Sequence, residues 1–333
     1  MHILNKEITN RTFQLILGYL WLLDGLLQLQ RQMFTSNFAN QVIATAASGQ
    51  PRVISGPMHL AIHLFLLNPK LFNSLAALTQ LAIGFLILNK KSVRVGLVLS
   101  IIWGLFVWYI GEGIGGIAGL HTILLMGAPG AALIYVILAA SIFPKKNKLL
   151  NKSYPSYWLV FAWLIFWVGG AIYMLLPGQN SVSDLSTMIG SNAQGLPGWL
   201  ASLDIHTSNV LSSLGSSTTS SSQMHMSASQ MSQMGAQQFG GFWLIIIFVV
   251  IQLAVGTFVL FGSKLRKYAI YVGIILSLIF WVIGQSFGGI FTGLGTDPNS
   301  GPLFIILGIA ILAIPNIDKK LSDLLDKIES ILT

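Results

Sequence analysis

The stretch Trp108–Ile117 reads WYIGEGIGGI, and 173 residues later Trp281–Ile290 reads WVIGQSFGGI. The match extends beyond these two segments, because the pentapeptide QLAIG at Gln80–Gly84 returns as QLAVG at Gln252–Gly256. Self-similarity of this kind has to be recognised before a fold is named. The chain is therefore predicted to hold two copies of one unit, and each copy is mostly hydrophobic.

The composition indicates a membrane protein. Of 333 residues, 54% are hydrophobic and 8% are charged, whereas soluble domains carry about 25% charged residues. The chain has no cysteine, which excludes disulfides, thiolate-bound iron–sulfur clusters and cysteine nucleophiles. Residues 1–11 are polar with mixed charge and no cleavage site follows them, so we expect no cleaved signal peptide.

Apolar stretches predict an all-α, polytopic fold with eight transmembrane helices, since a crossing needs roughly 17 to 25 apolar residues. The spans are expected at roughly 12–30, 69–89, 93–112, 128–144, 155–176, 241–262, 266–285 and 302–316. Residues 1–150 then form the first four-helix repeat and 151–316 the second. Residues 317–333 alternate apolar and charged positions at helical spacing, which predicts an amphipathic helix on the inner surface that binds lipid or docks a partner.

The basic residues predict the orientation. All of the 18 Lys and Arg residues except Arg31, Arg52 and Lys70 fall on one side of the eight predicted spans. The positive-inside rule then places both termini in the cytoplasm, in the plasma membrane of a prokaryote. The net charge of +8 thus faces anionic lipid headgroups and predicts no nucleic-acid partner. An even number of spans per copy predicts a parallel repeat about an axis along the membrane normal.

Two long segments are expected on the outer side of the membrane. The first contains a helix-like stretch at Pro57–Phe65. The second carries extra residues around 212–235, rich in Ser, Thr, Met and Gln, which predict a flexible loop because they cannot bury a core.

Two acidic residues are the candidate catalytic groups, for proton transfer or as part of a quinone site. Asp24 lies in the outer half of the first span, where an ionisable group is costly. Its alternative role is a protonated carboxyl hydrogen-bonded to a neighbouring helix. Glu112 ends the third span, and the second copy has Gln285 there. Glu112 is a candidate for proton transfer or cation coordination in the first copy only, or a solvated carboxylate at a helix end.

The glycines around these positions are present in both copies. The Gly111/Gly115 and Gly284/Gly288 spacing indicates close helix packing or a tight turn. The following segment Asp297–Pro302 predicts a turn that caps the last helix. Tryptophans near the span ends, Trp103 among them, are expected to be interfacial anchors.

The histidines suggest a metal site. His59 and His63 are four residues apart and would share a helix face, and thioethers together with imidazoles suit copper. A histidine pair that hydrogen-bonds at the lipid interface is the alternative. The copper candidates are His59, His63, His121, His225, Met224 and Met226.

The first copy resembles the DoxX/DoxD-like family of four-helix membrane proteins. The likeness rests on Leu17–Leu26 in the first span and on Gln80–Leu88 followed by Lys90, Lys91 and Arg94. Some members of that family are membrane subunits of thiosulfate:quinone oxidoreductase. The resemblance implies the four-helix fold and an association with quinone, and it carries over no catalytic residue.

Three functions follow as hypotheses. The first is a membrane subunit or partner of a respiratory or sulfur-linked, quinone-associated electron-transfer complex, whose partners would be respiratory or dehydrogenase subunits. The second is a structural or assembly protein that docks partners. The third is a small-molecule or ion transporter built on the two repeats, with Asp24 and Glu112 on a central pathway.

Overall fold

A computed structural model describes residues 8–144, 153–215 and 228–332, and every regular element in this part of the chain is helical. The elements that form the body of the protein are α1 (Asn10–Leu27), α3 (Arg52–Leu67), α4 (Pro69–Leu88), α5 (Val93–Phe106), α6 (Ala131–Ser141), α7 (Leu159–Tyr173), α8 (Val182–Ser191), α9 (Gly198–Gly215), α10 (Ala228–Thr257), α11 (Ser263–Ile279), α12 (Ser300–Leu312) and α13 (Ile317–Leu332).

Four helices are long and apolar enough to cross a membrane. They are Pro69–Leu88, Val93–Gly111, Phe242–Leu260 and Ser263–Gly284, and they coincide with four of the eight predicted spans. A fifth is obtained if Ser300–Leu312 and Ile317–Leu324, bent by 85°, count as one span. The remaining predicted spans are helical too, but α6 and α7 are shorter, with 11 and 15 residues. The protein is thus a multi-pass helical membrane protein in contact with lipid.

The long helices pack in two groups, each in chain order. Helix α1 contacts α4, α4 contacts α5 and α5 contacts α6, while α7 contacts α10, α10 contacts α11 and α11 contacts α12. The groups meet where α6 contacts α12 and α7. Glycines bring α1 and α4 together, since a Cβ atom on Gly84 would lie 2.9 Å from the carbonyl oxygen of Gly18. Small residues at such contacts are typical of membrane helices.

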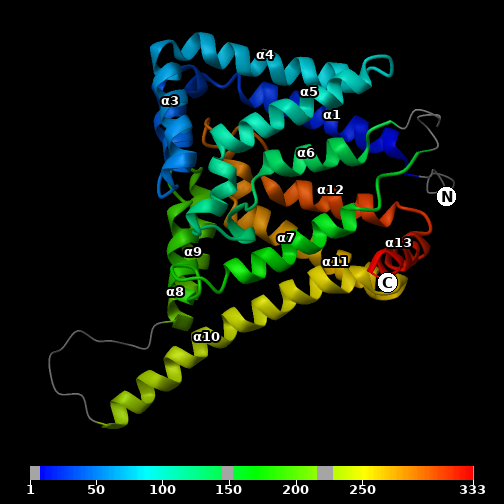
Figure 1. Ribbon diagram of the computed structural model, residues 1–333. Helices are drawn as coiled ribbons and strands as arrows, with labels where there is room; N and C mark the ends of the chain where they lie inside the picture. The colour runs from blue at the N-terminus through cyan, green and yellow to red at the C-terminus, as the bar shows by residue number, and fades with distance from the viewer. Residues whose placement is uncertain (1–7, 145–152, 216–227, 333) are drawn as a thin grey trace.

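The two ends of this bundle differ (Figure 1). The start of α1 and all of α13 lie at one end, here called the α13 end. Helices α3, α8 and α9 lie at the opposite end, the α3 end, where they run across the direction of the bundle. Helix α3 contains the predicted helical stretch Pro57–Phe65, which is therefore confirmed. Helix α13 confirms the predicted C-terminal helix, and its Asp318 pairs with Arg266 of α11 at 2.7 Å.

The prediction of a flexible loop at 212–235 is wrong at both ends of that segment. Ser212–Gly215 complete α9, and residues from Ala228 onward belong to α10, while 216–227 lie outside the described residues. The physical reason is that Ala, Gln and Met are good helix formers, so a segment without a hydrophobic core can still extend an apolar helix.

Both glycine motifs form the same broken helix end. Helices α5 and α11 each finish in a π-helical turn, at Val107–Gly111 (η3) and Phe280–Gly284 (η8). The backbone then turns through positive φ, at +65° for Gly115 and +72° for Gly288. A Cβ atom on Gly288 would lie 2.6 Å from the carbonyl oxygen of Asp297. The glycines therefore make tight turns that let a later loop approach the helix end.

Candidate functional site

A cavity of about 410 Å³ lies on the first-group side of the bundle, next to α3. Ligand pockets commonly measure about 300 to 1,000 Å³. Its walls come from α1, α3, α4, α5, η3, α6, the π-helical segment η2 (Phe38–Ile43), and the loop before α12. The cavity thus joins segments from the beginning, the middle and the end of the chain.

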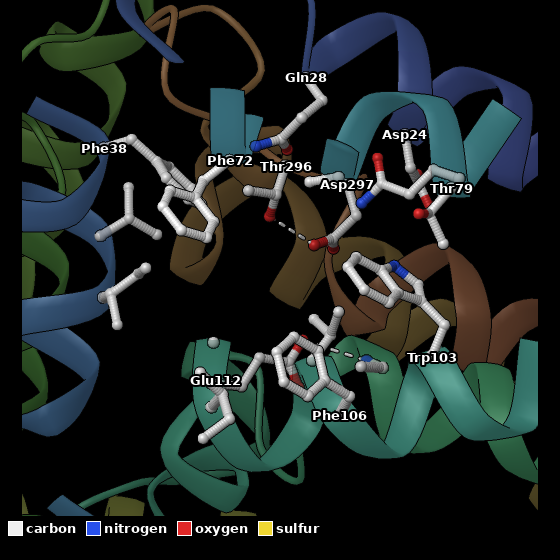
Figure 2. A pocket seen from close by; sticks show the side chains of 18 of the residues that line it. Asp24, Gln28, Phe38, Phe72, Thr79, Trp103, Phe106, Glu112, Thr296 and Asp297 are labelled. Atoms are coloured by element: carbon white, nitrogen blue, oxygen red, sulfur yellow. Dashed lines mark hydrogen bonds between the residues drawn. The ribbon is translucent and has the colours of Figure 1, made fainter. Parts of the chain in front are cut away.

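Most of the wall is apolar and aromatic. Phe38, Phe65 and Phe72 line the part nearest α3, and Trp103 and Phe106 of α5 line another part. Figure 2 shows Phe38 and Phe72 towards one end of the space and Asp24 and Trp103 towards the other. Such a surface suits the apolar body of a ligand.

Some of the buried polar atoms without a hydrogen-bond partner lie in the wall of the same cavity. An orphaned buried polar group costs about 1 to 3 kcal/mol, and native proteins hold few of them. Within the described chain, two lining residues carry such an atom, Gln80 Oε1 and Trp103 Nε1. The Asp24 carboxyl and the Tyr135 hydroxyl interact with each other, and Glu112 interacts with the backbone N–H groups of Ala131 and Ala132. A bound molecule with hydrogen-bonding groups would satisfy them.

Asp24 is positioned by the buried face of α1. Its residue is 2% exposed. One turn earlier, Trp21 donates its indole N–H to Ser100 Oγ at 2.8 Å and packs edge-on against Tyr135, with ring centroids 4.7 Å apart. These contacts fix the rotation of α1, so the Asp24 carboxyl faces the cavity. Tyr135 belongs to α6, so the interaction of its hydroxyl with Asp24 agrees with the predicted alternative of a carboxyl hydrogen-bonded to a neighbouring helix, and the same carboxyl also lines the cavity.

Glu112 and Gln285 perform the same local task in the two glycine motifs. Glu112 Oε1 accepts a hydrogen bond from the backbone N–H of Ala132 at 3.0 Å, in the first turn of α6. Gln285 Oε1 accepts from the backbone N–H of Gly301 at 2.9 Å, in the first turn of α12. Glu112 is therefore a helix-capping group rather than a carboxylate at an open helix end. The Glu112 carboxyl also interacts with the backbone N–H of Ala131 and forms part of the cavity wall.

Asp297 is a third carboxyl at this site, and it comes from the opposite end of the chain. Asp297 Oδ1 accepts from the backbone N–H of Asn299 and Oδ2 accepts from Thr296 Oγ1, both at 2.7 Å. Asn299 in turn caps α12, so the predicted capping turn is confirmed. Burial raises the pKa of Asp297, and these two hydrogen bonds partly offset the increase.

The three carboxyl groups lie close enough for their charges to interact. They do not come together as one ligand set, because no group of three His, Asp or Glu residues among the described residues could hold a metal ion. Figure 2 shows the same dispersal, with Asp24, Glu112 and Asp297 at separate positions around the space. The three carboxyls are therefore spread around the cavity and are not arranged to coordinate a single metal ion.

In the part of the chain that the structure describes, the predicted copper ligands are not brought together at one site. His59 and His63 share α3 and are both exposed. His121 lies in the loop before α6, where Nδ1 is 2.8 Å from the carbonyl oxygen of Gly119. Met224, His225 and Met226 lie outside the described residues.

Sequence reasoning missed four members of the site. Asp297 was expected only as a turn residue, and Trp103 only as an interfacial anchor. Gln80 carried a signal, since it belongs to the repeated QLA(I/V)G segment. Tyr135 carried none, because an aromatic residue in an apolar helix is ordinary.

The comparisons with known proteins add no relative: no family model, no curated protein and no solved structure matches this chain.

Proposed function

We propose that this chain is an integral membrane protein that binds an amphipathic small molecule in the cavity. The observation that carries the proposal is a largely apolar cavity whose wall holds three carboxyls, of Asp24, Glu112 and Asp297, and the unpartnered polar atoms of Gln80 and Trp103. An apolar body would occupy the part lined by phenylalanines, and a polar head would satisfy the orphaned atoms. A carrier that releases this molecule on either side of the membrane is one form of the function.

The test compares a variant that fills the cavity with one that does not. Ala76 of α4 lines the cavity, whereas Leu78 is 63% exposed on the same helix and is not a lining residue. We expect a small molecule to co-purify in gentle detergent with the wild type and with L78W, and to be lost from A76W. Mass spectrometry of solvent extracts measures it, and identical extracts from all three proteins would contradict the proposal.

A second candidate is a quinone-associated subunit of an electron-transfer complex. It is favoured by the unpartnered donor Trp103 Nε1, which suits a carbonyl oxygen of a planar quinone between aromatic walls. The resemblance to DoxX/DoxD-like proteins supports the same ligand. Quinone in the wild-type extract, together with co-purifying dehydrogenase or oxidase subunits, is the expected result for this candidate.

We further propose that the chain is a tandem duplication with eight crossings. The repeated sequence supports this, as does the identical packing order within the two helix groups. Helices α6 and α12 are shorter than the roughly 20 residues that a span needs, so the glycine-rich segments before them would complete their crossings. Irregular backbone at membrane depth is tolerated where protein buries it.

The orientation belongs to the same proposal. The α13 end, with Lys90, Lys91 and Lys319 near it, would face the cytoplasm of a prokaryote, and the α3 end would face outward. The binding cavity would then lie near the outer surface.

A further inference from the structure

The polar end of the cavity is acidic and has no basic partner. Asp24, Glu112 and Asp297 line it, while none of the lining residues in the described chain is Lys, Arg or His. The salt bridge between Arg266 and Asp318 involves no lining residue. Removing a carboxylate from water without a counter-charge costs several kcal/mol. A positively charged occupant would remove that cost.

The second copy shows that the fold does not require these carboxyls. Along the sequence repeat, Asp24 corresponds to Gly170, Glu112 to Gln285 and Asp297 to Leu124. Leu124 packs directly on Gly170, so that a Cβ atom there would collide with the leucine side chain. The position that carries a carboxyl in the first copy is thus a glycine covered by Leu124 in the second.

Gln285 completes this contrast. Its Nε2 donates to the carbonyl oxygen of Leu124 at 3.3 Å and to Ser300 Oγ at 3.1 Å, and its Oε1 accepts from Gly301. Both polar atoms of the amide are thus satisfied within the protein. The cavity has an acidic residue at each of these three positions, although the fold does not need one there. We therefore attribute the three carboxyls to the ligand that the cavity binds.

We propose that the ligand is an amphipathic organic cation, such as a protonated amine or a quaternary ammonium compound, whose head lies among Asp24, Glu112 and Asp297. This inference rests on the proposed binding function and names its ligand class. The dispersed carboxyls suit a bulky, diffuse charge better than a metal ion. Trp103 and Tyr135 line the same region, and aromatic faces attract organic cations.

The experiment uses two probes of matched shape and opposite charge. Tetraphenylphosphonium and tetraphenylborate are titrated by equilibrium dialysis against the full chain in phosphatidylcholine nanodiscs. After binding to empty nanodiscs is subtracted, we expect the phosphonium to bind the protein more tightly than the borate by about tenfold or more, because the carboxylates attract a cation and repel an anion. The neutral quinone analogue decylubiquinone serves as the third probe.

Variants test the carboxyls individually. D24N, E112Q and D297N should each weaken phosphonium binding by about tenfold or more. The matched control D323N removes an exposed carboxyl of α13 and should change nothing. E112Q keeps the experiment decisive even if D24N misfolds, because Gln285 already caps the corresponding helix in this chain.

Equal binding of the two ions, or phosphonium binding unchanged in E112Q and D297N, would overturn the cation inference. Decylubiquinone binding that A76W abolishes, without any preference for the cation, would do the same while the proposed binding function stands. If A76W leaves the binding of all three probes unchanged, the proposed function itself fails.

Discussion

At the scale of single residues, Glu112 combines two tasks that substitution can separate. The carboxyl caps the first turn of α6 and also forms part of the cavity wall. We expect E112Q to unfold within about 1 kcal/mol of the wild type, because an amide can accept the same bond. E112A should lose about 1 to 3 kcal/mol, since the N–H of Ala132 loses its acceptor. Thermal unfolding in detergent measures both, and equal midpoints for E112Q and E112A would contradict the capping role.

Asp297 makes a prediction about pH. Because its pKa in the folded protein is raised above the ordinary value of 3.8, the folded state binds the proton more tightly than the unfolded state. Stability should therefore fall as pH rises from about 4 towards neutrality, and it should be recovered on acidification within that window. We expect D297N to show a flatter profile of unfolding midpoint against pH. A D297N profile that parallels the wild type would rule out this contribution.

At the scale of elements, the turn that follows η8 places the loop of Asp297. Gly288 and Gly289 have similar backbone angles, with φ of +72° and +64°. A Cβ atom on Gly288 would collide with the backbone of Asp297, at 2.6 Å from its carbonyl oxygen, whereas on Gly289 it would meet Thr292 only at 3.7 Å. G289A should thus cost roughly 1 to 2 kcal/mol for the left-handed conformation alone.

G288A should cost more than G289A and should also weaken ligand binding, because the collision displaces the loop that carries Asp297. Unfolding midpoints and dialysis with tetraphenylphosphonium measure the two effects. Equal losses of stability in the two variants would mean that the close approach of loop and turn does not matter.

At the scale of the whole molecule, the absence of native cysteine allows the orientation to be mapped by single substitutions. Arg52 begins α3, Lys90 lies between α4 and α5, and Lys319 lies on α13; all three are exposed. We expect a membrane-impermeant maleimide to label R52C in intact cells, and K90C and K319C only after permeabilisation. Labelling of K90C and K319C in intact cells would place the α13 end outside.

The site shows where prediction from sequence stops. Asp24 and Glu112 could be named because a carboxyl in an apolar helix is costly wherever that helix packs. Asp297 could not, because its neighbours Pro298 and Asn299 explain it fully as a turn residue. Trp103 and Tyr135 likewise have ordinary local explanations, and only the folded protein places both of them in the cavity wall, Trp103 with an unpartnered indole N–H and Tyr135 beside Asp24.

Features that depend on local energetics can be read from the residues alone. The low charge content specifies a membrane protein, the long apolar runs specify the four longest spans, and the glycines and Asn299 specify turns and caps. Only the packing of the helices brings Asp297 to the cavity beside Asp24 and places Leu124 directly on Gly170. The physical reason is that a cavity is space left between helices distant in the chain, so its lining depends on how those helices pack and not on any local pattern.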